Sequence, residues 1–69
     1  MEYKFYKHTG ISTEIRPYIE GENLAGVNVD FFDHPEVGGV IARNVHHHED
    51  QWYITKSYFE NFIEVKENE

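Results

Sequence analysis

The residues best suited to chemistry form one polar run, His46-His47-His48-Glu49-Asp50. Imidazole and carboxylate groups are ligands that zinc and nickel accept. In an extended loop His46 and His48 project to the same side of the chain, which makes them the metal-binding alternative. Candidates for a third ligand are His8, Asp33 and His34. Because two ligands from one loop do not close a tetrahedral site and no Cys is available, we interpret the run as a solvated spacer and expect no metal or other cofactor.

The chain shows no pattern typical of an enzyme. Ser12 and Ser57 lie in no context that would activate a nucleophile, and no glycine-rich phosphate loop is present. The pair Gly38-Gly39 indicates a tight turn before a strand. Carboxylates are plentiful, but in an acidic chain they are usually solvated. We therefore expect a protein that is not an enzyme and has no catalytic residues.

Length and composition restrict the class of protein further. We expect 69 residues to form a single domain, spanning 1–69, whose core is built from five Tyr, five Phe and one Trp. The absence of Cys favours a reducing, cytoplasmic setting, and neither a signal peptide nor a membrane span is predicted. A net charge of −7 argues against direct binding to nucleic acid or to an anionic membrane.

The elements that position these residues are mostly strands. Period-two alternation and turn residues predict strands over 2–8, 11–20, 27–32, 40–44 and 51–55. Pro17 makes the second segment either an edge strand or a strand that bends there. In the third segment, Val27, Val29 and Phe31 are predicted to point inward. In the fifth, Trp52 and Ile54 share the core face.

A short helix is predicted near the C-terminal end. Ser57 and Glu60 fit a capping box, and Phe59, Phe62 and Ile63 follow as one helical stripe. Beyond the helix, Ile63 and Val65 could add a last short strand. The predicted fold is α+β and mostly β: a small curled antiparallel sheet, or a partly open barrel, of four to five strands with one short C-terminal helix.

A partner-binding surface is predicted on the outer side of the segments around Trp52. Tyr53 falls on the strand face opposite Trp52, and Tyr58 lies off the predicted helical stripe. Aromatic and arginine side chains dominate protein interfaces, so we expect this surface to bind a protein. Its predicted residues are Arg43, Tyr53, Tyr58, Asp30, Glu60 and Glu64.

Three motifs in the second half of the chain carry a family resemblance. They are Gly39-Val40-Ile41-Ala42-Arg43-Asn44, then His48-Glu49-Asp50-Gln51-Trp52-Tyr53-Ile54, then Tyr58-Phe59-Glu60-Asn61-Phe62. Together they resemble a group of small tailed-bacteriophage proteins with the pattern G-D-M-I-A-R-N-P, D-Q-W-L-V, Y-F and N-F-E. The segment 21–29 is similar to their G-E-x-L-x-G-V-S-V. Gly39 stands where an acidic residue is usual, and Val45 stands where Pro is expected.

The resemblance implies a phage origin and an accessory role inside the host cell, and it carries over no catalytic residue. The leading hypothesis is a non-enzymatic phage accessory protein. It would bind and modulate a host or phage protein, such as a nucleic-acid-acting or defence factor, through an acidic and aromatic surface. The alternatives are a small-molecule or metal-binding module, with a pocket formed by Trp52, Arg43 and the His run, and a minor virion component. A homo-oligomer also fits these observations.

Overall fold

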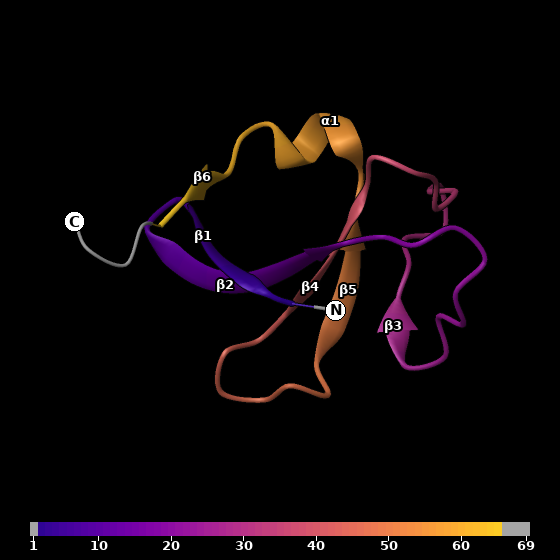
Figure 1. The fold of residues 1–69 in the computed structure, drawn as a ribbon, viewed down its shortest axis with the longest axis horizontal. Coiled ribbons are helices and arrows are strands. Elements are labelled where there is room, and N and C mark those ends of the chain that lie inside the picture. The colour runs from indigo at the N-terminus through magenta and orange to yellow at the C-terminus, as the bar shows by residue number, and fades with distance from the viewer. Residues whose placement is uncertain (1, 66–69) are drawn as a thin grey trace.

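A six-stranded mixed sheet with one short helix forms this molecule (Figure 1). The structure is a computed structural model and describes residues 2–65. The elements are β1 (Lys4–His8), β2 (Ile11–Pro17), β3 (Val27–Asn28), β4 (Val40–Arg43), β5 (Gln51–Ile54), α1 (Lys56–Phe59) and β6 (Ile63–Glu64). The order across the sheet is β3-β5-β4-β2-β1-β6. All neighbouring strands are antiparallel except β3 and β5, which are parallel.

The mostly β class with one short helix is confirmed, whereas the strand count and the barrel are wrong. The sheet has six strands, and its edges, β3 and β6, do not pair with each other, so it stays open. Both edge strands have only two residues. Figure 1 shows them on opposite sides of the molecule. Short edge strands limit the exposed row of backbone groups without closing the sheet.

Pro17 ends β2 rather than marking an edge strand, because β2 lies inside the sheet between β4 and β1. The amide of Tyr18 donates to the carbonyl of Gly39 at 3.0 Å. Antiparallel bonding alternates along a strand, so the nitrogen of Pro17 points the other way, toward β1. Since β1 begins at Lys4, which pairs with Ile15, the missing N–H of Pro17 removes no bond from the ladder.

The prediction that Tyr, Phe and Trp build the core is wrong, because the buried residues are mostly aliphatic and, within residues 2–65, Tyr53 is the one buried aromatic residue. Ile41 and Tyr53 are buried on one face of the sheet, and the main cluster lies on the other. Side chains of Ile15, Val40, Ala42 and Ile54 form its buried centre. The partly buried aromatic residues packed against them are Tyr6, Trp52, Phe59 and Phe62. The predicted core positions Trp52, Ile54, Phe59 and Phe62 are therefore confirmed, with Ile54 the only fully buried one of the four.

The helix has a different cap from the predicted one. Thr55, not Ser57, is the N-cap: its side chain accepts a hydrogen bond from the amide of Tyr58. The helix ends at Phe59, so Phe62 and Ile63 do not continue a helical stripe, and Ile63 is 73% exposed. The last short strand is confirmed as β6, which pairs with β1. Directly after it, the amide of Val65 donates to the carbonyl of Phe5 at 2.8 Å.

Candidate functional site

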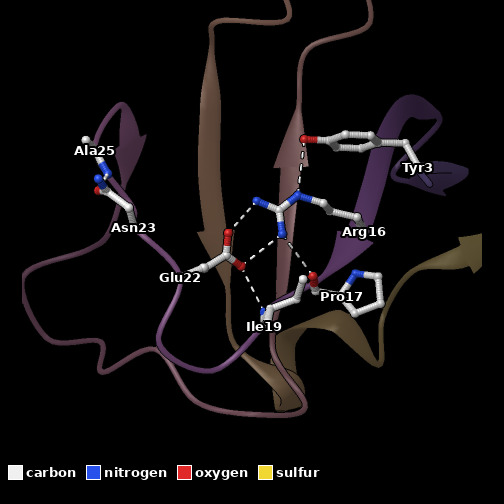
Figure 2. Close-up of polar contacts among 7 residues, drawn as sticks. All are labelled: Tyr3, Arg16, Pro17, Ile19, Glu22, Asn23 and Ala25. Carbon is white, nitrogen blue, oxygen red and sulfur yellow. Dashed lines mark hydrogen bonds and ion pairs between the residues drawn. The ribbon is translucent and has the colours of Figure 1, made fainter. Parts of the chain in front are cut away.

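An ion pair between Arg16 and Glu22 holds the loop that leads from β2 to β3 (Figure 2). Two guanidinium nitrogens of Arg16 donate to the two carboxylate oxygens of Glu22, at 2.9 and 2.7 Å. The same carboxylate accepts from the amide of Ile19 at 2.8 Å. Hydrogen bonds from Arg16 lower the pKa of Glu22, against the opposing effect of burial. This bidentate clamp ties the start of the loop, at Glu22, back to β2.

A second polar cluster lies on the same face of the sheet and contains Arg43. Its guanidinium carbon lies 3.6 Å from the centre of the Tyr3 ring, and its Nε donates to Glu14, which is directly opposite in the ladder. Glu14 also lies 3.2 Å from Nε2 of His48. The charge and the planar face of Arg43 are therefore both engaged within the chain, on the sheet face opposite Trp52.

Tyr53 is also not a surface residue. It does lie on the sheet face opposite Trp52, as alternation predicts, but it is only 6% exposed. Its ring packs edge-on against Tyr18, with centroids 6.0 Å apart, and its hydroxyl accepts from the amide of Glu36 at 3.2 Å. A Cβ atom at Gly39 would lie 2.2 Å from that hydroxyl, so the glycine makes room for the ring. Tyr53 is therefore buried and does not lie on the outer surface where the alternation placed it.

The opposite face carries an open groove of about 550 Å³ beside Trp52, which we call the Trp52 groove. Ile54 from β5 and Thr13 from β2 lie in it together with Trp52. Two smaller hollows, of about 310 and 380 Å³, adjoin it, and Trp52 lines all three. The indole is only partly buried although it belongs to the core. Helix α1 therefore leaves part of this sheet face uncovered.

Aromatic side chains form one wall of the groove. The Tyr58 hydroxyl lies 3.1 Å from Nε2 of His8, and the two ring centroids are 5.3 Å apart. Phe62 packs against both rings, at 4.7 Å from His8 and 5.9 Å from Tyr58. These contacts join β1 to the helix and hold Tyr58 in place although it is 50% exposed. Tyr58 thus remains a partner-binding candidate.

Thr13 supplies a polar group to the floor. The residue is only 8% exposed, and its hydroxyl makes no side-chain hydrogen bond within residues 2–65. No side-chain oxygen or nitrogen in that range is both fully buried and unsatisfied, so the hydroxyl must be reachable from the groove. Thr13 lines both the Trp52 groove and the hollow beside Val45. A ligand in the groove can therefore hydrogen-bond to it.

The turn Asp30-Phe31-Phe32-Asp33 borders the groove, which its two aspartates line. The amide of Asp33 donates to the carbonyl of Asp30 at 2.9 Å, which places both Phe residues at the tip. Phe31 is 89% exposed and Phe32 is 83% exposed, with ring centroids 5.4 Å apart. The prediction that Phe31 points inward is wrong. Polar residues and glycine normally occupy turn tips, so two exposed phenylalanines there suggest a surface that another molecule covers.

The groove brings together only part of the predicted site. Asp30, Tyr53 and Tyr58 line it. Glu60 is exposed at the end of α1 and Glu64 is half-buried in β6, and neither lines the groove. The sequence analysis named His8, Asp33 and Trp52 only for a metal site or another pocket, and it missed Thr13 of the groove and the exposed tip Phe31 and Phe32. Of these, the run D-F-F-D was the one visible signal.

The His run forms a short loop between β4 and β5. The amide of His46 donates to the side chain of Asn44 at 2.8 Å, and His48 contacts Glu14. Within residues 2–65 no group of three or more His, Asp or Glu side chains lies close enough to hold a metal ion. Of the alternative pocket of Trp52, Arg43 and the His run, Trp52 and His46 do line one hollow of about 380 Å³, whereas Arg43 lies on the opposite face.

Comparison with known proteins adds no relative: no family, curated protein or solved structure matches the chain. No helix in the described part of the chain is long and apolar enough to cross a membrane.

Proposed function

We propose that this protein is a non-enzymatic phage accessory protein that binds a host or phage protein in the cytoplasm of the host cell. The exposed pair Phe31 and Phe32 carries the proposal. Aromatic residues are enriched in protein interfaces, where burying one removes on the order of 150–250 Å² from water. Two such rings at the tip of one turn offer a partner a compact apolar anchor.

The surroundings of the anchor favour a basic partner. Asp30 and Asp33 flank the two rings, and within residues 2–65 neither carboxylate has an ion-pair partner. The chain as a whole carries a net charge of −7. Complementary charge raises association rates and rejects wrong partners. A host or phage factor that acts on nucleic acid would present the basic surface that this acidic chain fits.

A double variant of the two phenylalanines and a control variant test the proposal. The variant Phe31→Ser/Phe32→Ser removes the anchor, and Ile63→Ser serves as control because it removes a 73% exposed apolar side chain at the opposite edge of the sheet. Tagged versions are expressed in host cells, and co-purified proteins are quantified. We expect one or more specific proteins to be lost with the double variant and retained with the control. Equal recovery with all three forms would refute the proposal.

The small-molecule alternative keeps one supporting observation, which is the size of the Trp52 groove. Its volume of about 550 Å³ falls within the range typical of ligand pockets. The groove is open, however, and the two hollows that share Trp52 with it reach Asn28 and Val29 in one case and Val45 and His46 in the other. An elongated, open groove fits a segment of polypeptide better than a small compact ligand.

A further inference from the structure

We infer that the Trp52 groove takes an extended segment of the partner protein, with an arginine or lysine side chain placed over the Trp52 indole and between Asp30 and Asp33. This inference rests on the proposed function, because it names the chemistry of the partner that the exposed turn would hold. It adds a second contact, on the sheet face, to the apolar anchor at the turn.

Charge is the first argument. Both carboxylates of the turn line the groove and also the hollow next to β3. The two arginines of the chain, Arg16 and Arg43, are engaged by Glu22 and Glu14 on the other face of the sheet. The residues that line the groove include no Lys or Arg, and His8 is the only one that can become positive. A cationic side chain of the partner would therefore neutralise the negative charge of these two carboxylates.

The Trp52 ring is the second argument. Its indole is partly exposed in the middle of the three adjoining hollows. A guanidinium or ammonium group over an indole gains a cation–π interaction, for which Trp is the best aromatic partner. The chain already uses this contact internally, where the Arg43 guanidinium lies 3.6 Å from the centre of the Tyr3 ring. Arginine also stacks flat and can pair with two carboxylates at once.

The Thr13 hydroxyl is the third argument, and it depends neither on the charge of the turn nor on the Trp52 ring. It is a polar group on a residue only 8% exposed, it lacks a side-chain partner within residues 2–65, and it lines the groove. It lies where the groove continues toward Val45 and His46, whereas the two aspartates lie where it continues toward β3. A ligand that reaches both ends needs a polar group at some distance from its cation. An extended peptide has such groups in its backbone.

Trp52 is the only tryptophan, so its fluorescence reports directly on the groove. The probes are acetyl-Gly-Leu-Arg-Leu-Gly-amide and the same peptide with citrulline, which is neutral and nearly isosteric with arginine. We expect the arginine peptide to bind about fivefold more tightly than the citrulline peptide. Asp30→Asn/Asp33→Asn should bring the two affinities within about twofold of each other. Thr13→Val should weaken both peptides by a similar factor and leave their ratio unchanged.

The matched control is Glu20→Gln/Glu49→Gln, which removes two exposed carboxylates outside the groove. It should keep the preference for arginine. Equal binding of the two peptides, or an equal loss of preference in the control, would overturn the inference. The variant Phe31→Ser/Phe32→Ser should retain the preference for arginine. If it does while partner recovery in cells is unaffected by that variant, the proposed function fails and the groove inference stands. If the preference for arginine is absent while Phe31→Ser/Phe32→Ser loses the partner in cells, the groove inference is rejected and the proposed function stands.

Discussion

The clamp between Arg16 and Glu22 gives the most direct prediction about what holds the site in place. In Glu22→Gln, one of the two carboxylate acceptors becomes an NH₂ donor that faces a guanidinium N–H. A hydrogen bond to a charged group contributes about 1.5–3 kcal/mol, whereas a fully exposed ion pair contributes about 0.2–1 kcal/mol. The side chains of Arg16 and Glu22 are 13% and 17% exposed. We therefore expect a loss of about 1–2 kcal/mol in the free energy of unfolding at pH 7.

The pH dependence of stability shows in which direction the contribution of Glu22 changes. Arg16 lowers the pKa of Glu22 in the folded chain below its value in the unfolded chain. A depressed carboxyl pKa stabilises the fold above the unfolded value of about 4.3, and this contribution is lost as the pH falls through the folded value. The difference between the native chain and Glu22→Gln should thus be full at pH 7 and shrink below about pH 4.

Urea unfolding followed by Trp52 fluorescence measures this difference at each pH. Glu20→Gln is the control, because Glu20 is exposed in the same loop and has no ion-pair partner among the described residues. We expect the control to change stability by less than about 0.5 kcal/mol. A Glu22→Gln variant as stable as the native chain at pH 7, or a deficit as large at pH 3 as at pH 7, would refute the reasoning.

The remaining predictions concern the Tyr53 packing, the helix cap and metal binding. Gly39→Ala should destabilise the fold by about 2–4 kcal/mol, because the new methyl would meet the buried Tyr53 ring and break its bond to Glu36. A melting temperature of Gly39→Ala equal to that of the native chain would contradict this. Thr55→Ala should cost about 1 kcal/mol and Ser57→Ala clearly less, since Thr55 is the N-cap; a larger loss from Ser57→Ala in the same melts would reverse the assignment. Zn²⁺ should leave the melting temperature unchanged, because residues 2–65 bring no three ligands together. A rise that His46→Ala/His48→Ala abolishes would restore the metal site.

The strands that pair with central neighbours were the predictable part of the fold. In 11–17, 40–43 and 51–54, alternation and flanking turn residues agree with the pairing that the sheet provides. The segment 27–32 alternates equally well, yet only Val27–Asn28 forms a strand. Alternation describes one strand and does not reveal how far its neighbour extends. The chain leaves β5 at the turn 30–33, which exposes Phe31 and Phe32.

The predicted partner surface was only partly correct for a related reason. Alternation correctly places Tyr53 and Trp52 on opposite faces of the sheet. It does not reveal that segments distant in sequence cover the face on which Tyr53 lies. Tyr18 and the Glu36 amide bury Tyr53, and Tyr3 with Glu14 engages Arg43. These contacts join residues that are far apart in the sequence, so no short motif predicts them. Asp30 and Tyr58 lie in the groove because the turn and the helix flank the same uncovered part of the sheet.

The central claim is that the turn at Phe31 and Phe32 contacts a protein partner. Its most direct test is photo-crosslinking in host cells, with benzoylphenylalanine in place of Phe31 in one protein and of Ile63 in another. Both positions are highly exposed, and they lie toward opposite edges of the sheet. We predict a discrete crosslinked protein from position 31 and none from position 63. A crosslink from position 63 alone, or the same products from both positions, would contradict the claim.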